Sequence, residues 1–278
     1  MRIGVAGLGL IGGSLALALR ERHEVRGFDM ARDVREAAAR AGIPGVEHVE
    51  ALVPADAVIV ATPMSAVLPT LAALAPKADG AVLIDVASVR APVDAFARED
   101  ASGARIVGLH PMAGSTDAGF AAARADLFRD RLFLVVPTAS SDSQAMAVAG
   151  ILARDAGGDA TVVSADVHDR AVAYLSGLPL AAAAATAMVA TAQPLELAGP
   201  GLRDTTRLAL TPEELALDLL LSNAMTVAKA TKRLADQLEW LSNVIVDRDR
   251  AQLRDFLRAA RAARLEMDRD QRRDRSIS

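Results

Sequence analysis

The sequence feature that most constrains the fold is a glycine-rich turn near the N-terminus. It lies between an apolar run, Arg2–Ala6, and a segment of helical period, Gly13–Arg22. A strand, a G-x-G-x-x-G turn and a helix in this order are typical of a dinucleotide-binding α/β domain. The first glycine permits the tight turn, the second lets the backbone approach a pyrophosphate, and the third lets helix and strand pack closely. The predicted cofactor-binding residues of the turn are Gly7, Leu8, Gly9, Leu10, Ile11 and Gly12.

An acidic residue is placed to bind the adenosine ribose of such a cofactor. Asp29 follows the predicted strand Glu24–Phe28 and lies twenty residues after Gly9. A carboxylate at this position binds the ribose hydroxyls and repels a 2′-phosphate. The sequence therefore predicts NAD as the cofactor, while the nearby Arg32 leaves NADP as a less favoured alternative.

Three further loops follow predicted strands, at the edge where open α/β sheets bind their ligands. Thr62 and Pro63 form the first loop, and we expect them to face the cofactor. Ser88 lies in the second and could hydrogen-bond a substrate or an imidazole, although a helix cap fits it nearly as well. His110 opens the third, where a neutral imidazole is a good general base. On position alone, a structural histidine fits His110 equally well.

The order of predicted elements indicates two domains. Short β-branched runs alternate with helical segments as far as residue 163, and helices alone follow. We predict a Rossmann-type, doubly wound, mostly parallel sheet in residues 1–164 and an all-α domain in residues 165–278. The predicted strands are Arg2–Ala6, Glu24–Phe28, Ala57–Ala61, Ala81–Val86, Ile106–Leu109, Leu132–Val136 and Thr161–Val163. The last stretch, Arg261–Ser278, is predicted to be a solvated helix end with a frayed tail.

Composition excludes several classes of function. The chain has 278 residues, no cysteine and four histidines, which excludes disulfide scaffolds, thiolate metal sites and cages of several imidazoles. A net charge of -4 and 3% aromatic residues argue against nucleic-acid binding. The alanine-rich segment Leu178–Ala192 is only weakly hydrophobic. We therefore expect a cytoplasmic protein with a small-molecule substrate, no bound metal and no membrane segment.

Taken together, five segments make the chain resemble the prephenate and arogenate dehydrogenase family of tyrosine biosynthesis, nearly from end to end. The first is common to many dehydrogenases, whereas the third and fifth together are far more specific. The segments are Gly7–Ala16, Asp85–Arg90, His110–Ser115, His168-Asp169 with Ser176–Pro179, and Gly201–Arg207.

The resemblance implies a function and assigns roles. The family oxidises a ring carbinol with NAD while the ring carboxylate leaves as carbon dioxide, so that prephenate becomes 4-hydroxyphenylpyruvate. It implies that His110 is the catalytic base and that Ser88 orients the hydroxyl and the imidazole. It further implies that Arg207, with Arg203 as second candidate, clamps a substrate carboxylate, and that Gly114 contacts the substrate. For Arg207, a surface salt bridge remains the alternative.

One departure from the family pattern bears on the substrate. Many members that use prephenate carry two histidines in an S-H-L-P-H segment, where this chain has Gly177 and Leu180. This loss makes arogenate dehydrogenase the main alternative function. His168 could be a further polar contact, although a helix-start histidine paired with Asp169 is the simpler interpretation.

The helical domain resembles the family's dimerisation domain, which implies a homodimer. A catalytically silent NAD-binding sensor and a hydroxy-acid dehydrogenase remain as less favoured alternatives. The second would carry a catalytic lysine in its helical domain, but Lys229 and Lys232 lie in no recognisable motif.

Overall fold

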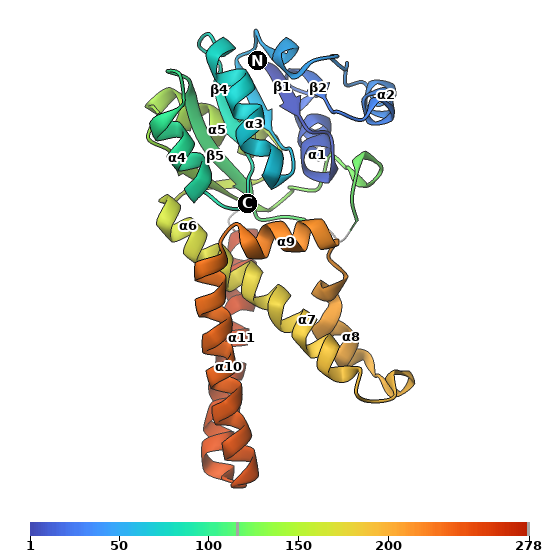
Figure 1. Cartoon of the computed structure of the whole chain (residues 1–278), viewed down its shortest axis with the longest axis vertical. Coiled ribbons are helices and arrows are strands. Elements are labelled where there is room, and N and C mark those ends of the chain that lie inside the picture. Colours follow the sequence, from blue (N-terminus) through green and yellow to red (C-terminus); the bar gives the residue numbers. More distant parts are fainter. Residues whose placement is uncertain (115–116, 277–278) are drawn as a thin grey trace. The chain divides into compact units, whose positions relative to one another are not determined.

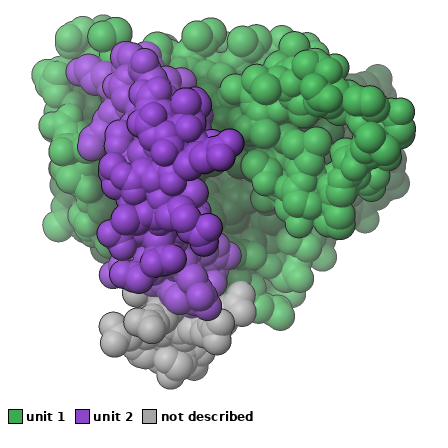
Figure 2. Space-filling view, turned by 90° about the horizontal axis from the view of Figure 1, so that it is seen from below, with its two compact units in different colours: residues 1–226 green, residues 227–278 purple. Residues whose placement is uncertain are grey.

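The computed structural model describes residues 1–114 and 117–276, with side chains as far as residue 268 (Figure 1). Its contacts group into two units, Met1–Thr226 and Val227–Ser278 (Figure 2). The sheet and every predicted site residue lie in the first unit.

In the described residues, seven strands form one sheet in the order β2-β1-β3-β4-β5-β6-β7. Neighbouring strands are parallel except β5 and β6, which pair antiparallel. This sheet and the helices that follow it confirm the predicted fold class. The strands are β1 (Arg2–Ala6), β2 (Glu24–Phe28), β3 (Ala57–Val60), β4 (Val82–Asp85), β5 (Arg105–Pro111), β6 (Leu132–Pro137) and β7 (Asp159–Val162).

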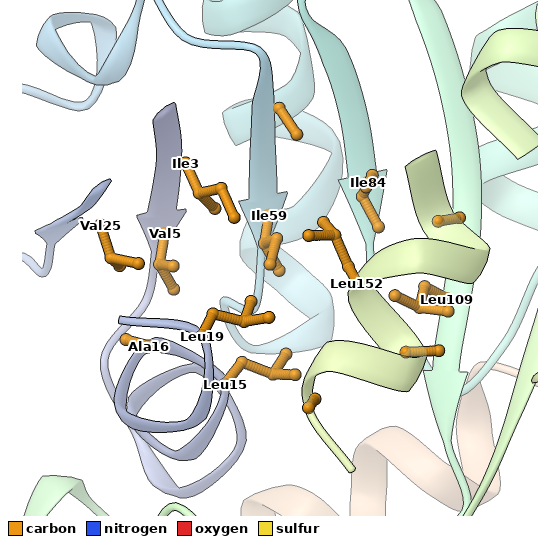
Figure 3. Packing of buried hydrophobic residues seen from close by; sticks show 14 of the residues in the cluster. Ile3, Val5, Leu15, Ala16, Leu19, Val25, Ile59, Ile84, Leu109 and Leu152 are labelled. Atoms are coloured by element: carbon orange, nitrogen blue, oxygen red, sulfur yellow. The ribbon is translucent and has the colours of Figure 1, made fainter. Parts of the chain in front are cut away.

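Helices cover both faces of the sheet, so its central strands are apolar throughout. On β3, Ala57 and Ile59 pack on one face, whereas Val58 and Val60 pack on the other. The first face, drawn in Figure 3, is covered by α1 (Leu10–Leu19), α2 (Arg32–Arg40) and α5 (Ser143–Asp155). The second is covered by α3 (Met64–Leu74) and α4 (Ala91–Glu99).

The strand order reverses between β1 and β3, and this reversal positions the site. The chain moves from β1 to β2 on one side and then crosses back to β3 on the other. Helices that leave adjacent strands on opposite faces open a crevice at their carboxyl ends. The glycine turn ends β1, and Thr62 follows the end of β3, so the two lie at this crevice.

A long helix follows the sheet. It runs from α6 (Ala165–Val172) through a π-helical turn (Ala173–Gly177) into α7 (Leu178–Ala190). In the described part of the chain it is the one helix long and apolar enough to cross a membrane, with a mean hydropathy of 1.6 and 28% of that window buried. These criteria rest on length and composition alone, and a helix that packs on a soluble domain meets them as well.

Shorter helices complete the first unit, namely α8 (Pro200–Thr206) and α9 (Glu213–Leu221). The second unit consists of α10 (Ala224–Val246) from Val227 onward and α11 (Arg250–Ser276). The two helices pair through Trp240 and Phe256, whose ring centroids are 5.4 Å apart. Residues 261–267 of the predicted tail are exposed and helical, and residues 277–278 lie outside the described residues. The predicted domain boundary at residue 164 stays a prediction.

Candidate active site

The three glycines of the N-terminal turn occupy different environments. Gly7 has a φ of +90°, and a Cβ there would lie 2.6 Å from the carbonyl oxygen of Ala61. A Cβ on Gly12 would lie 1.9 Å from the carbonyl oxygen of Gly7. By contrast, a Cβ on Gly9 would meet nothing within 4 Å. A side chain at Gly7 or Gly12 would therefore collide with the backbone of the turn, whereas the space beside Gly9 is open.

This open space fits a dinucleotide. Gly9 is the N-cap of α1 and offers no side-chain cap, so the first amides of the helix remain available to a pyrophosphate. Within the described residues, the hydroxyl of Thr62 is buried without a hydrogen-bond partner. Leu8 is fully buried in the core, while Leu10 and Ile11 pack against it from the first turn of α1.

Asp29 is anchored to the glycine turn. Its carboxylate accepts hydrogen bonds from the amide of Leu8 at 2.9 Å and from that of Ala31 at 3.0 Å. Each carboxylate oxygen has a second lone pair, so the group can still accept ribose hydroxyls. Arg32, which would favour a 2′-phosphate, instead bonds Glu36 at 2.9 Å with its side chain 84% exposed.

The loop after β3 is connected to the helical segment. Pro63 is the N-cap residue of α3, and the amide of Met64 donates to Asp218 on α9 at 3.2 Å. A carboxylate at a helix N-terminus is favoured by the helix dipole. This contact holds the Thr62 loop to α9, and sequence reasoning missed it because the two residues are 154 positions apart.

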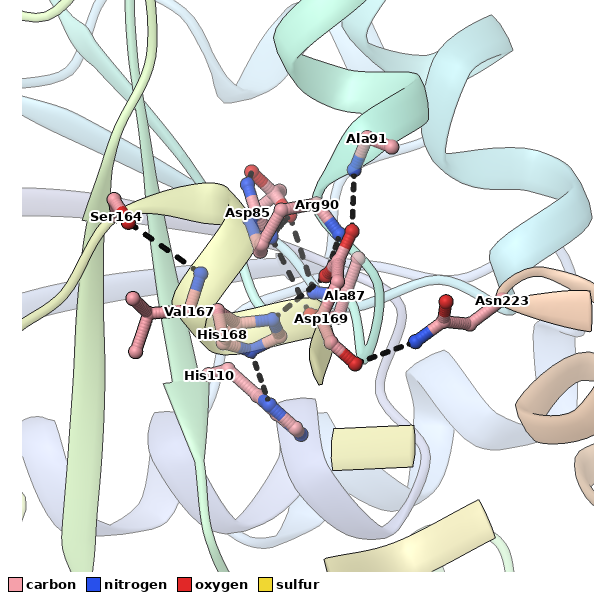
Figure 4. Close-up of polar contacts among 10 residues, drawn as sticks. All are labelled: Asp85, Ala87, Arg90, Ala91, His110, Ser164, Val167, His168, Asp169 and Asn223. Atoms are coloured by element: carbon pink, nitrogen blue, oxygen red, sulfur yellow. Dashed lines mark hydrogen bonds and ion pairs between the residues drawn. The ribbon is translucent and has the colours of Figure 1, made fainter. Parts of the chain in front are cut away.

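His110 lies at the carboxyl end of β5 and contacts a second histidine. Its Nδ1 is 2.9 Å from Nε2 of His168 on α6 (Figure 4). His168 is fully buried, and its Nδ1 lies 2.8 Å from Oδ1 of Asp169. The structure thus places three titratable side chains in a line that ends at the predicted base.

Asp169 is held from several sides. Its carboxylate accepts hydrogen bonds at the N-terminus of α4, from the amide of the N-cap residue Arg90 at 2.8 Å and from that of Ala91 at 3.0 Å. Its backbone carbonyl accepts one from the side chain of Asn223 at 2.6 Å. The helix cap predicted as an alternative role for Ser88 is therefore supplied by Asp169.

A buried ion pair lies beside this line of residues. Both guanidinium nitrogens Nη1 and Nη2 of Arg90 bond the carboxylate of Asp85, the last residue of β4, and both side chains are almost completely buried. A bidentate pair of this kind compensates two charges that would otherwise be costly to bury.

Burial and neighbouring charges shift the pKa values of this cluster. Burial is the main cause that lowers the pKa of His110 to about 3, assisted by repulsion from His168 when that ring is protonated and by repulsion from Arg90. His110 is therefore neutral near pH 7, as a proton acceptor must be. Burial opposes ionisation of Asp169, but the hydrogen bonds from His168 and from the amides of Arg90 and Ala91 lower its pKa below the usual range.

The remaining predicted substrate residues are not joined to this cluster. Ser88 is half-buried, and Gly114 is exposed with open space around its Cβ position. Arg203 and Arg207 are exposed on and just after α8, and neither forms an ion pair within the part of the chain that the structure describes. Their predicted roles stay predictions. Ser115 of the predicted motif lies outside the described residues.

Sequence reasoning missed the contact between His168 and His110. It paired His168 with Asp169 at a helix start and offered a polar contact as the other role of His168, but it named no partner for that contact. The available signal was the adjacent histidine and aspartate after Ser164, which caps α6 by accepting from the amide of Val167. Nothing in their spacing indicated a partner 58 positions away.

Two protein-family models match most of this chain. A family model described as "Prephenate dehydrogenase, nucleotide-binding domain" matches residues 15–162. The chain belongs to the prephenate dehydrogenase family. A second model, "Prephenate dehydrogenase, dimerization domain", matches residues 164–259. The resemblance inferred from the motifs is thereby confirmed.

Two prephenate dehydrogenases and one arogenate dehydrogenase are similar over most of the chain. The "Prephenate dehydrogenase" of Bacillus subtilis (strain 168) is 32% identical over 79% of this chain, which spans 63% of the relative's length. The structure of prephenate dehydrogenase from A. aeolicus in complex with hydroxyphenyl propionate and NAD+ is 25% identical, with a TM-score of 0.88, over 95% of this chain and 97% of that one. The structure of Synechocystis arogenate dehydrogenase is 27% identical, with a TM-score of 0.82, over 96% of this chain and 100% of that one.

Proposed function

We propose that this chain is an NAD-dependent prephenate dehydrogenase that converts prephenate to 4-hydroxyphenylpyruvate and carbon dioxide. The observation that carries the proposal is the position of His110 at the carboxyl end of β5, on the sheet edge that also carries the dinucleotide turn. A base at this edge can serve a reaction beside a bound nicotinamide. Family membership supplies the reaction type.

The reaction requires a hydride acceptor, a proton acceptor and a site that binds the dinucleotide. NAD, when bound, supplies the hydride acceptor. His110 takes the proton of the ring hydroxyl as the hydride leaves the same carbon, and the ring carboxylate departs as carbon dioxide. Gly7, Gly9 and Gly12, with Thr62 and the first amides of α1, would hold the dinucleotide.

The substrate requires cations as well as a base, because prephenate carries two carboxylates. Arg207, with Arg203 as second candidate, is proposed to bind one of them, since both guanidinium groups are exposed and without an ion pair among the described residues. Ser88 is proposed to orient the reacting hydroxyl, and Gly114 to leave room for the ring.

Arogenate is the second candidate substrate, and one observation favours it. Gly177 and Leu180 occupy the positions where many prephenate-using members carry histidines, and both are buried. The chain therefore places no polar side chain there to bind the keto-acid end of prephenate. The similarity to an arogenate dehydrogenase from Synechocystis points the same way.

We also propose an oligomeric state, a domain boundary and a cellular location for this chain. We propose a homodimer formed through the helical segment, because residues 164–259 match the family's dimerisation domain and α7 leaves Met188 and Val189 exposed. We further propose that the NAD-binding domain ends near residue 164, and that the protein acts in the cytoplasm.

Turnover assays with purified protein, NAD and either prephenate or arogenate test this proposal directly. NADH formation with prephenate at a higher kcat/KM than with arogenate is the expected result. A preference for arogenate would replace the substrate and keep the reaction. NADH binding without turnover of either substrate would overturn the proposal in favour of a sensor.

A further inference from the structure

We propose that His168 and Asp169 are positioning residues that set the tautomer of His110 and leave its Nε2 as the proton acceptor. The inference rests on the proposed function, because it assumes that His110 is the base. It extends that function by assigning a role to two residues of α6 that lie behind the base (Figure 4).

The direction of the hydrogen bonds begins at Asp169. An ionised carboxylate can only accept hydrogen bonds, and this one accepts them from the amides of Arg90 and Ala91. Its remaining contact, with Nδ1 of His168 at 2.8 Å, must therefore be donated by the imidazole. The proton of His168 is thereby fixed on Nδ1.

The same rule then determines the state of His110. When His168 is neutral with its proton on Nδ1, its Nε2 has a lone pair and accepts from its neighbour. Nδ1 of His110, 2.9 Å away, is that donor. Neutral His110 consequently has its lone pair on Nε2, and no described residue bonds to that atom. Nε2 is thus the one nitrogen of this ring that can take a proton from a substrate.

The surrounding contacts hold this arrangement in place. His168 is fully buried, so its ring is fixed by packing as well as by two hydrogen bonds. The amide of Asn223 bonds the backbone of Asp169, and the N-terminus of α4 favours its negative charge. When His110 takes up a proton, its Nδ1–H still donates to His168, and the charge of Asp169 opposes the repulsion of the new cation by Arg90.

The substitution Asp169→Asn tests the tautomer. An asparagine has one acceptor oxygen and one amide group, so it cannot accept from His168 and from both α4 amides. Oδ1 of Asp169 accepts from both His168 and the Arg90 amide, and Oδ2 accepts from the Ala91 amide, so an asparagine loses at least one of these contacts in either orientation. The orientation that turns its amide to His168 reverses both rings and places the proton of His110 on Nε2. We expect kcat to fall about 100-fold or more, while the Kd for NADH and the KM stay within about twofold.

A second histidine–aspartate pair provides a matched control, because its loss should not affect the tautomer of His110. His23 and Asp155, in the same unit, are also 2.8 Å apart, at Nε2 and Oδ2. We expect Asp155→Asn to leave kcat unchanged. Asp169→Glu, which retains a carboxylate, should have a higher kcat than Asp169→Asn.

His168→Phe tests the other residue of the pair. It removes the acceptor for His110 but leaves Asp169 to cap α4, and it should lower kcat about as much as Asp169→Asn does.

Nitrogen-15 NMR of the histidine rings provides a readout that does not depend on turnover. In the unliganded wild type, Nε2 of His110 should show the shift of an unprotonated nitrogen, and Asp169→Asn should convert it to a protonated one. Folded Asp169→Asn and His168→Phe variants with wild-type kcat, or a protonated Nε2 of His110 in the unliganded wild type, would overturn the inference. A wild-type protein that turns over neither substrate would instead overturn the proposed function, and the ring shifts would still decide the inference.

Discussion

Gly108 on β5 lies directly against the guanidinium of Arg90, and a Cβ built on it would be 2.5 Å from Cζ of Arg90. Asp85, which binds that guanidinium, is the partner of Gly108 in the β4–β5 register. The absence of a side chain on β5 therefore makes room for a buried ion pair beside His110. Such close approaches of a charged group to a strand are a recognised use of glycine.

The substitution Gly108→Ala is expected to destabilise the protein. The new methyl group must displace Arg90, and overpacking of this kind costs roughly 1–3 kcal/mol before any loss of the ion pair. The free energy of unfolding from urea titration gives the size of the effect. Gly150→Ala on α5 is the matched control, because its Cβ would meet only the end of the Arg154 side chain at 3.5 Å. A Gly108→Ala protein as stable as the control would show that Arg90 moves without cost.

The N-terminal turn offers a test that separates a binding glycine from a structural one. The built Cβ of Gly9 meets nothing within 4 Å and its φ is -70°, so Gly9→Ala should leave the melting temperature unchanged. The methyl group would occupy space needed for the pyrophosphate and should raise the Kd for NADH about tenfold or more. Gly12→Ala should instead lower the melting temperature, because its Cβ would lie 1.9 Å from a carbonyl oxygen. If both substitutions changed the Kd for NADH and the melting temperature equally, Gly9 could not be a binding glycine and Gly12 a structural one.

Much of the sheet could be predicted because its strands are buried on both faces and read as continuous apolar runs. The predicted β1 and β2 coincide with the observed ones, and the predicted Ala57–Ala61 differs from β3 by one residue. The predicted Thr161–Val163 starts two residues late, because β7 is exposed along its whole length and lacks a clear apolar signal. The antiparallel β5–β6 pairing left no local trace in the sequence.

The site was predictable to the extent that strand ends identify it. Asp29, Thr62 and His110 could be placed at one edge of the sheet because each follows a predicted strand, although the observed β5 extends through His110 to Pro111. The contact that sets the state of His110 comes from α6, and only tertiary packing brings His168 to it. The roles of Arg203 and Arg207 rest on the resemblance alone, because neither side chain contacts the His110 cluster.

Arg207 is expected to act on substrate binding rather than on the fold. It is exposed and forms no ion pair with other described residues, so Arg207→Gln should leave the melting temperature and the Kd for NADH unchanged. Loss of a bidentate carboxylate contact costs about 1.5–3 kcal/mol, which corresponds to a rise in KM of roughly tenfold to a hundredfold. Arg203→Gln is the parallel variant. A larger effect of Arg203→Gln would exchange the assigned roles, and no effect of either would show that the clamp is elsewhere.

The depressed pKa of His110 makes the stability of the protein depend on pH in a defined window. The unfolded chain binds a proton at this histidine below its ordinary pKa of 6.5, whereas the folded chain, with burial as the main cause, does not until about pH 3. Between these values the unfolded state holds more protons, so stability falls as the pH is lowered, by up to about 1.4 kcal/mol per pH unit. Asp169 adds to this loss only near and below its ordinary pKa of 3.8.

Urea titrations at several pH values between 6.5 and 4.5 isolate the contribution of His110 from that of Asp169. Wild-type stability should fall steadily across this range, and the fall should be smaller in His110→Asn, which cannot take up the proton in either state. The same variant should bind NADH normally and lose about a hundredfold or more in kcat. Identical pH dependences in the two proteins would mean that the folded state accommodates a charged His110, and its assignment as a neutral base would then need a different physical cause.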